Sequence, residues 1–255
     1  DHINVLLGQE WSSSKEKETY KTTVAYPATY SINDVRNDPD NGTALASELD
    51  IPAKDNLSSV FGRVNYTMAE KYLATFTLRA DGSSKFGRGH RWGVFPSLAV
   101  AWRMSDENWL KNAKWLSNLK ARLSFGTAGN NRISSGLLQT TYSITATGNK
   151  HAAFNEITST QLDHNTTLYN PNLKWETTVT RNFGFDYGFF QGRLNGTLDF
   201  YWNTTRDLLM KVEIPSSTGY QYQYQNYGQT SNKGVEFTVN GVFVQSKNFN
   251  LNGTA

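Results

Sequence analysis

The sequence predicts an all-β fold, an antiparallel transmembrane β-barrel segment of about nine strands. Apolar and polar residues alternate along most of the 255-residue chain, as in strands that have one face in lipid and the other in a polar lumen. The alternating runs are long, reaching ten or more residues, whereas strands of soluble proteins usually have about five to six. Short and long connections take turns along the chain, and Phe, Trp and Tyr make up 13% of the residues. Together these features favour a membrane barrel.

The two-residue period defines each expected strand. In the run RLNGTLDFYWN, for example, Leu194, Leu198, Phe200 and Trp202 share one face and Asp199 lies on the other. The same period, bounded by polar or glycine-containing turns, marks the other strands. The expected strands are 2–11, 57–67, 71–80, 91–103, 119–127, 174–188, 192–205, 231–244 and 248–255.

The connections between these strands fall into two classes. Outer-membrane barrels have long extracellular loops and short periplasmic turns. We therefore expect extracellular loops near 11–56, 81–90, 128–173 and 206–230. The expected periplasmic turns are 68–71, 104–118, 188–192 and 245–248. The segment 104–118 is predicted to form one short helix, with Ser105 as N-cap and Asp106 and Glu107 in its first turn.

Two tryptophans, Trp92 and Trp102, bracket the stretch RWGVFPSLAVAWRM. They have the same parity as Val94, Leu98 and Val100, so all five side chains point to one side. Ten residues of strand extend about 33 Å, which at a tilt of about 40° projects to about 25 Å, the height of the apolar band of an outer-membrane barrel. We expect this strand to face lipid, with Trp92, Trp102 and Trp202 at the membrane interfaces.

Composition and motifs exclude several other functions. The net charge of +3 is too small and scattered for a nucleic-acid footprint, and without cysteine the chain has neither disulfides nor thiolate metal sites. Mean hydropathy is −0.57, and no apolar run approaches the roughly 18 residues of a spanning helix. The four histidines show no metal-binding spacing and no catalytic motif is present. We expect no enzymatic activity, metal or cofactor.

Two alternative classes fit parts of the pattern. Periodicity alone fits equally well a soluble secreted or surface β-sandwich that binds carbohydrate, with its apolar faces packed together. A β-rich hydrolase is the weaker alternative, because it needs paired carboxylates in a cleft. Asp186, Asp199 and Glu236 are the carboxylates considered for that role, and they are scattered along the sequence.

Several motifs, in order, resemble the barrel of SusC/RagA-type TonB-dependent outer-membrane transporters of Bacteroidetes. They are YLATFTLRADGSSKFGRGHRWGVFPSLAVAWRMSDENWL, LSNLKARLSFGTAGNNRI, NPNLKWETTVTRNFGFDYGFF, LNGTLDFYWNTTRDLL and YGQTSNKGVEFTVNG, within residues 57–255. The resemblance implies a 22-stranded barrel around a plug domain, with this chain as an internal piece of the wall that does not include the plug. It also implies a SusD-like surface lipoprotein as partner, energy from TonB through an N-terminal region absent here, and an oligosaccharide or peptide as substrate.

Polar residues of the opposite parity are expected to face the barrel lumen. There they can contact the plug or a solute, although structural salt bridges and solvation are the plainer role. They are Arg63, Arg79, Arg103, Lys120, Arg122, Asp186, Asp199 and Glu236.

The loop GYQYQYQNYG places four tyrosines among Gln and Asn. Such side chains can stack on sugar rings and bond their hydroxyls. Packing within the loop or contact with the lipoprotein is an equally plain role. The candidate substrate-binding residues are Tyr220, Tyr222, Tyr224 and Tyr227.

Overall fold

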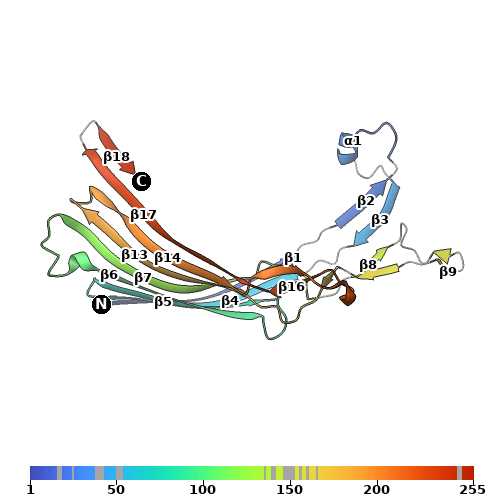
Figure 1. The fold of residues 1–255 in the computed structure, drawn as a ribbon, viewed down its shortest axis with the longest axis horizontal. Helices are drawn as coiled ribbons and strands as arrows, with labels where there is room; N and C mark the ends of the chain where they lie inside the picture. Colours follow the sequence, from blue (N-terminus) through green and yellow to red (C-terminus); the bar gives the residue numbers. More distant parts are fainter. Residues whose placement is uncertain are drawn as a thin grey trace.

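The chain forms one large, curved antiparallel sheet with smaller hairpins at one end (Figure 1). The computed structural model describes residues 1–15, 19–24, 26–37, 43–49, 54–134, 136–138, 142–145, 153–154, 157–158, 161–164, 166–245 and 249–255. The sheet has nine strands in the order β1-β4-β5-β6-β7-β13-β14-β17-β18. In the described part of the chain it is an open arc with β1 and β18 at its edges.

All nine expected strands are present, and most are longer than expected. The all-β prediction is therefore confirmed. The strands of the main sheet are β1 (His2–Lys15), β4 (Lys54–Met68), β5 (Tyr72–Ser83), β6 (Trp92–Arg103), β7 (Leu116–Asn130), β13 (Glu176–Phe189), β14 (Leu194–Arg206), β17 (Gln229–Gln245) and β18 (Asn250–Thr254).

The connections at the two ends of the sheet differ in length. At one end, here the short-turn end, β4 joins β5 and β13 joins β14 by tight turns, in which Ala69, Glu70, Phe190 and Gln191 have left-handed backbone angles. Such angles suit the twist of a hairpin. The fourth expected turn, 245–248, lies largely outside the described residues. The opposite end, here the long-loop end, carries the smaller hairpins and the α-helix (Figure 1).

The elements of the long-loop end are small hairpins and turns. The one α-helix of the described part, α1, is capped at its N-terminus by two reciprocal hydrogen bonds. Ser31 N donates to Asp34 Oδ2 (2.8 Å), and Asp34 N donates to Ser31 Oγ (3.3 Å). The elements are β2 (Thr19–Val24), α1 (Ile32–Asn37), β3 (Thr43–Leu49), β8 (Tyr142–Thr145), β9 (Ala153–Phe154), β10 (Ile157–Thr158), β11 (Gln161–His164), β12 (Thr167–Leu168), β15 (Leu209–Glu213), η3 (Ser216–Thr218) and β16 (Tyr222–Asn226).

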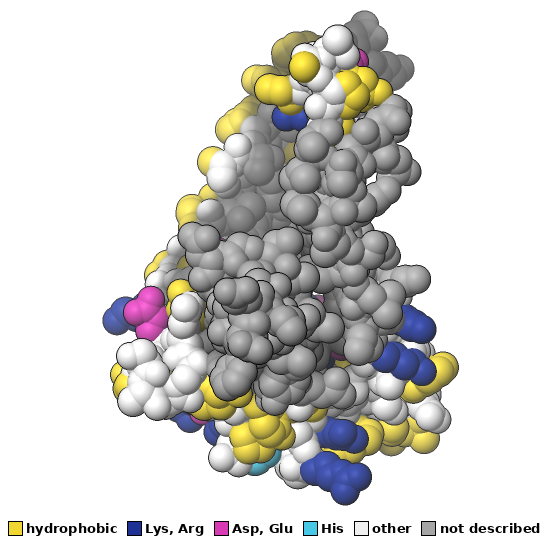
Figure 2. All heavy atoms as spheres, turned by 90° about the vertical axis from the view of Figure 1, so that its right-hand side faces the viewer, with side chains coloured by type: hydrophobic (Ala, Val, Ile, Leu, Met, Phe, Trp, Pro, Cys, Tyr) yellow, Lys and Arg dark blue, Asp and Glu magenta, His cyan; other side chains and the backbone are white. Residues whose placement is uncertain are grey.

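One face of the main sheet is apolar and uncovered. The register pairs Val64 with Phe76, and Phe76 with Leu98, so these side chains lie on the same face. On this apolar face Leu7 is 81% exposed and Val94 is 61% exposed. Seen from the long-loop end, hydrophobic side chains follow the left-hand outline of the molecule (Figure 2). A soluble sandwich would cover such a face with a second sheet, and the described residues supply none.

A proline separates two strands near the long-loop end. Strand β6 pairs with β5 from Trp92 to Trp102, but with β7 only from Ser97 onward. Pro96 has no N–H to donate, so a regular ladder toward β7 cannot continue through it. Instead, the Thr127 hydroxyl donates to the Pro96 carbonyl oxygen at 3.1 Å. Strands β6 and β7 therefore diverge from Pro96 toward the long-loop end.

The main hydrophobic core of the described residues lies where these strands diverge. The rings of Phe86 and Phe95 lie 5.3 and 5.5 Å from that of Trp175, between centroids. Leu173 and Ile133 complete the buried cluster. The Trp175 indole N–H donates to the Arg91 carbonyl oxygen at 2.8 Å. The core is therefore small, and it fixes three loops to the sheet rather than filling a globular interior.

The segment 104–118 differs from the expected helix. It contains a single 3-10 turn, η2 (Met104–Asp106), with Arg103 at its N-cap and no side-chain capping bond, so the assignment of Ser105 as N-cap was wrong. Glu107 ends the turn and bonds to neighbouring strands. Its carboxylate accepts from the Tyr72 hydroxyl (2.7 Å), the Trp102 indole N–H (3.1 Å) and Lys71 Nζ (3.1 Å). These contacts compete with continuing the helix.

Hydrogen bonds from Tyr72, which has the largest effect, and from Trp102 and Lys71 lower the pKa of the Glu107 carboxyl below its ordinary value. A lowered pKa in the folded state means that the stabilisation is present above the unfolded-state pKa and is lost as the pH falls through the folded-state value.

No helix among the described residues has the length and apolar character needed to cross a bilayer.

We predict that Glu107→Gln lowers the thermal midpoint of the intact protein in detergent at neutral pH. The difference from the unchanged protein should shrink as the pH falls below about 4, first as the carboxyl of the unfolded chain takes up a proton and then as that of the folded protein does. Glu70→Gln, in the exposed adjacent turn, is the control and should change little. Equal effects of the two substitutions, or a difference independent of pH, would contradict the assigned role of Glu107.

Candidate functional site

The second face of the sheet, here the polar face, carries all eight charged residues selected from the sequence. Their positions follow from the register: Thr77 pairs with Arg63 and with Ser97, and Ser97 pairs with Gly126, so these residues share one side. The remaining strands continue the same face through the pairing of Gly184 with Arg122 and with Asp199. The eight are Arg63, Arg79, Arg103, Lys120, Arg122, Asp186, Asp199 and Glu236.

Five of the eight gather on neighbouring strands around Arg122. Its Nε lies 2.8 Å from Asp186 and its Nη2 lies 3.0 Å from Asp199. Lys120 Nζ approaches Asp186 at 3.5 Å. Glu236 is the direct cross-strand partner of Asp199 and forms no ion pair among the described residues. One guanidinium thus joins β7, β13 and β14.

A glycine makes room for this network. Gly184 lies between Arg122 and Asp199 in the register. A Cβ at this position would stand 2.9 Å from Arg122 Nη2, and closer still to the Asp199 carboxylate. A side chain here would therefore displace the ion pair. Because Asp186 and Asp199 both bind Arg122, these carboxylates are held as ion-pair partners rather than as a free acid and base.

Arg79 forms a second hub on β5. Its Nε donates to Asp81 at 2.7 Å, and its Nη2 lies 2.9 Å from Ser59 Oγ and 3.2 Å from Glu10. Ser59 is fully buried, and the guanidinium also lies 5.4 Å from the Phe61 ring centre. The hub joins β1, β4 and β5, as the Arg122 hub joins three strands further along the sheet.

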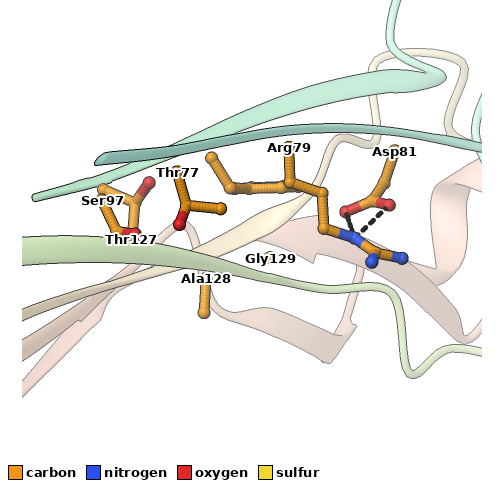
Figure 3. Close-up of a pocket in the computed structure, with 8 residues that line it drawn as sticks. Thr77, Arg79, Asp81, Ser97, Thr127, Ala128 and Gly129 are labelled. Atoms are coloured by element: carbon orange, nitrogen blue, oxygen red, sulfur yellow. Dashed lines mark hydrogen bonds and ion pairs between the residues drawn. The ribbon is translucent and has the colours of Figure 1, made fainter. Parts of the chain in front are cut away.

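A hollow of about 310 Å³ opens beside Arg79 (Figure 3). Arg79 and Asp81 border it together with hydroxyl side chains, and Phe95, which belongs to the hydrophobic core, also lines it. It therefore offers a cation, an anion and hydroxyl groups beside an apolar wall. The lining residues are Thr77, Arg79, Asp81, Phe95, Ser97, Thr127, Ala128 and Gly129.

A second hollow, of about 370 Å³, was missed by the sequence analysis. It is lined mainly by amide and hydroxyl side chains from β13, β14 and β17, and one buried amide oxygen, Asn203 Oδ1, has no hydrogen-bond partner there. The sequence shows each residue only as one polar position of a strand, because the register that aligns them is not visible in it. The lining residues are Thr180, Asn182, Tyr201, Asn203, Asn232 and Glu236.

The structure separates the four loop tyrosines into different environments. Tyr224 packs against the hydrophobic core, and its carbonyl oxygen accepts from the Asn170 side chain at 2.8 Å. The Tyr222 ring lies 4.2 Å from Lys211 Nζ. Tyr227 follows β16 and is 66% exposed, while Tyr220 is half-buried. The four therefore do not form one stacking surface, and Tyr227 is the most accessible.

The three selected tryptophans all lie on the apolar face. Trp92 stands at the long-loop end of β6 and is largely exposed. Trp102 stands at the short-turn end and stacks on Tyr72 with ring centres 6.4 Å apart. Trp202, on β14, is exposed and donates its indole N–H to Ser231 Oγ at 3.1 Å. Aromatic residues thus mark both ends of the apolar face.

Comparison with known proteins identifies the family to which this chain belongs. Residues 4–255 match the family described as TonB dependent receptor-like, beta-barrel. The chain belongs to this family, which confirms the barrel interpretation and the resemblance found in the sequence. Proteins of this family lie in the bacterial outer membrane, so the chain is part of an outer-membrane barrel wall.

Individual relatives agree with this assignment. The chain is 40% identical to the TonB-dependent receptor SusC of Bacteroides thetaiotaomicron over 197 residues, which are 77% of this chain and 19% of that protein. It is 38% identical to TonB-dependent receptor P26 of Formosa agariphila over 202 residues, 78% of this chain and 19% of that protein. The chain thus spans about a fifth of the length of the curated relatives it matches.

A solved structure matches almost the whole chain. The fold is similar to that of the RagAB peptide transporter, with a TM-score of 0.79 and 27% sequence identity, over 99% of this chain and 27% of that one. The soluble sandwich alternative is therefore not favoured. These relatives are a receptor and a transporter by name.

We predict that Arg122→Gln destabilises the intact barrel by about 1–3 kcal/mol, because it leaves Asp199 opposite Glu236 without a cation. The double variant Arg122→Gln, Asp199→Asn should recover part of this loss. Thermal unfolding in detergent measures both. Arg103→Gln, an exposed arginine of the same face, should change stability by less than about 0.5 kcal/mol. An Arg122 variant as stable as the Arg103 variant would remove Arg122 as a structural hub.

Proposed function

We propose that the chain is a wall segment of a TonB-dependent outer-membrane transporter that imports glycans or peptides. The observation that carries this proposal is the separation of the two faces of one antiparallel sheet. Its apolar face is exposed over all its strands, and its polar face carries ion pairs and two polar hollows. The apolar face is suited to contact with lipid, and the polar face is suited to a water-filled lumen.

The orientation follows from the lengths of the connections. The segments 11–56, 81–90, 128–173 and 206–230 are proposed as extracellular loops, and the short-turn end is proposed to face the periplasm. Trp92 and Trp202 then lie toward the outer interface and Trp102 toward the inner one. The eight charged residues of the polar face would line the lumen, where the two arginine hubs hold neighbouring strands together and leave Arg103 and Glu236 accessible to plug or solute.

The polar hollows and the exposed loop supply the groups that a glycan or a peptide needs. Amide and hydroxyl side chains donate and accept hydrogen bonds without charge, as sugar hydroxyls and peptide groups require. An exposed aromatic ring adds an apolar surface for a sugar ring or side chain. The name of one matched structure, a peptide transporter, supports the peptide class, and the names of matched TonB-dependent receptors support the TonB-dependent system.

The proposed partners follow from the family assignment. A SusD-like surface lipoprotein would close over the long-loop end and trap the solute, and TonB would act through a plug and N-terminal region in the whole protein. The residues of this chain would supply the fixed wall. The proposed role is transport rather than catalysis, and no group of three or more His, Asp or Glu side chains in the described part of the chain is placed to hold a metal ion.

Replacing loop tyrosines in the intact transporter tests solute capture. Tyr227→Ala should weaken ligand binding several-fold, because the exposed ring has no packing role in the described structure. Tyr222→Ala should weaken it less, and Tyr224→Ala should act through loop packing and lower stability as well. Binding of an oligosaccharide and a peptide panel, measured by isothermal titration, is the readout.

Phe190→Ala is the matched control, because this exposed aromatic residue lies in a turn at the opposite end of the sheet. It should leave capture unchanged. If Tyr227→Ala and Tyr222→Ala bind every ligand as the unchanged protein does, these tyrosines do not belong to the capture site. If the intact protein captures neither ligand class, the proposed substrate classes are wrong.

A further inference from the structure

The charged residues of the main sheet are sorted by sign between its two faces. Every acidic residue within the nine strands lies on the polar face, as the register shows. They are Glu10, Asp55, Asp81, Glu176, Asp186, Asp199 and Glu236. The apolar face carries charged residues as well, but all of them are basic. They are Lys15, Lys54, Arg181, Arg206 and Lys233.

These basic residues are also sorted along the strands. Lys15 ends β1 and Lys54 begins β4, both at the long-loop end. Arg181, Arg206 and Lys233 lie in the halves of β13, β14 and β17 nearest the same end. The half of the apolar face toward the short turns has no charged side chain in these strands. A charge in lipid is costly unless an opposite charge is near. This pattern therefore indicates negatively charged membrane groups at the level of the long-loop half of the strands, and none at the level of the other half.

The best-defined part of this pattern is a row across three strands. Trp202 pairs directly with Arg181 on one side and with Lys233 on the other. The Arg181 guanidinium lies 5.2 Å from the Trp202 ring centre and 5.9 Å from that of Phe125. With strands about 4.8 Å apart, the backbones of Arg181 and Lys233 stand about 10 Å from each other. Both side chains are long enough to converge on one headgroup between them.

Arg181 lacks the partner that a guanidinium normally has. Two aromatic rings hold it, but its Nη1 is enclosed and has no hydrogen-bond acceptor. No carboxylate in the described part of the chain pairs with Arg181 or Lys233. The rings compensate part of the cost of a cation beside lipid. An acceptor from outside the chain can reach only the guanidinium N–H groups that are not enclosed, and the described residues offer them no carboxylate.

The geometry points to a lipid-phosphate site formed by Arg181, Trp202 and Lys233 on the membrane face of the barrel, occupied by the phosphorylated glycolipid of the outer leaflet. Arg offers a planar pair of donors to two phosphate oxygens, and Lys adds a point charge. Trp202 lies between them at the level where indole rings favour the interface. This inference rests on the proposed function, because it requires the long-loop end to face outward.

Lipid binding to the intact transporter in neutral detergent tests the site. The probe is purified lipid A, compared with the same lipid after removal of its phosphate. For Arg181→Gln, Lys233→Gln, the Kd for lipid A should rise about thirtyfold, since each basic side chain near an anionic surface contributes about fivefold. The Kd for the dephosphorylated lipid should stay as in the unchanged protein, and already be weak there.

The control is Lys111→Gln, Lys114→Gln, which removes the same charge from exposed positions at the short-turn end. It should leave both Kd values unchanged. Lys233→Gln alone, at an exposed position, should raise the Kd for lipid A about fivefold and serves if the double variant does not insert. Equal losses in the two double variants, or equal binding of both lipids, would overturn the site.

Solute capture by the same variants separates this inference from the proposed function. If capture persists while lipid A binding is unaffected by the Arg181 and Lys233 substitutions, the lipid site is wrong and the transporter assignment stands. If the unchanged protein captures neither oligosaccharide nor peptide, the proposed substrate classes fail whatever the lipid result.

Discussion

The structure depends on one constraint: a backbone that crosses lipid must satisfy its hydrogen bonds within the protein, because lipid supplies no partners. A continuous antiparallel ladder meets this requirement from β1 to β18. Once the ladder is fixed, the two-residue period of a strand assigns each side chain to lipid or lumen. The chain has a small hydrophobic core for the same reason, since its largest apolar surface faces outward instead of inward.

Polar interactions replace a conventional core on the other face. Two arginines, Arg79 and Arg122, each join three neighbouring strands, their own included, through bonds to carboxylates or a hydroxyl. Such partly exposed pairs contribute modestly to stability one by one, but a network fixes side chains in place. The same arrangement leaves the amide-lined hollow of β13, β14 and β17 open, which suits a surface that touches a passing solute without holding it tightly.

Much of this could be predicted from the sequence because the period of two is a local property. The run from Trp92 to Trp102 alone indicated a long strand with aromatic ends, and parity placed Arg122, Asp186 and Asp199 on one face before their contacts were known. The contacts themselves depend on register, which joins residues far apart in the chain. The hollow around Asn182 and Asn203 was missed for that reason.

Other features of the structure depend on contacts that local rules do not include. The acidic start of 104–118 resembles a helix N-terminus, but Glu107 bonds to Tyr72 and Trp102 of adjacent strands and the helix stops after one turn. The tyrosines of 220–227 looked equivalent in sequence, and packing distinguishes Tyr224 from Tyr227. In each case the tertiary contact outweighs the local preference.

The barrel-wall assignment is tested most directly by measuring whether each face of the sheet contacts lipid or water. The chain has no cysteine, so spin labels can be placed at single cysteines introduced at Ser97, Leu98, Ala99 and Val100, in an intact transporter freed of other cysteines and inserted in liposomes. Labels at Leu98 and Val100 should be relaxed by oxygen dissolved in lipid, and those at Ser97 and Ala99 by a water-soluble nickel complex. Four labels with the same accessibility, or Leu98 and Val100 open to the nickel complex, would contradict a barrel wall between lipid and lumen.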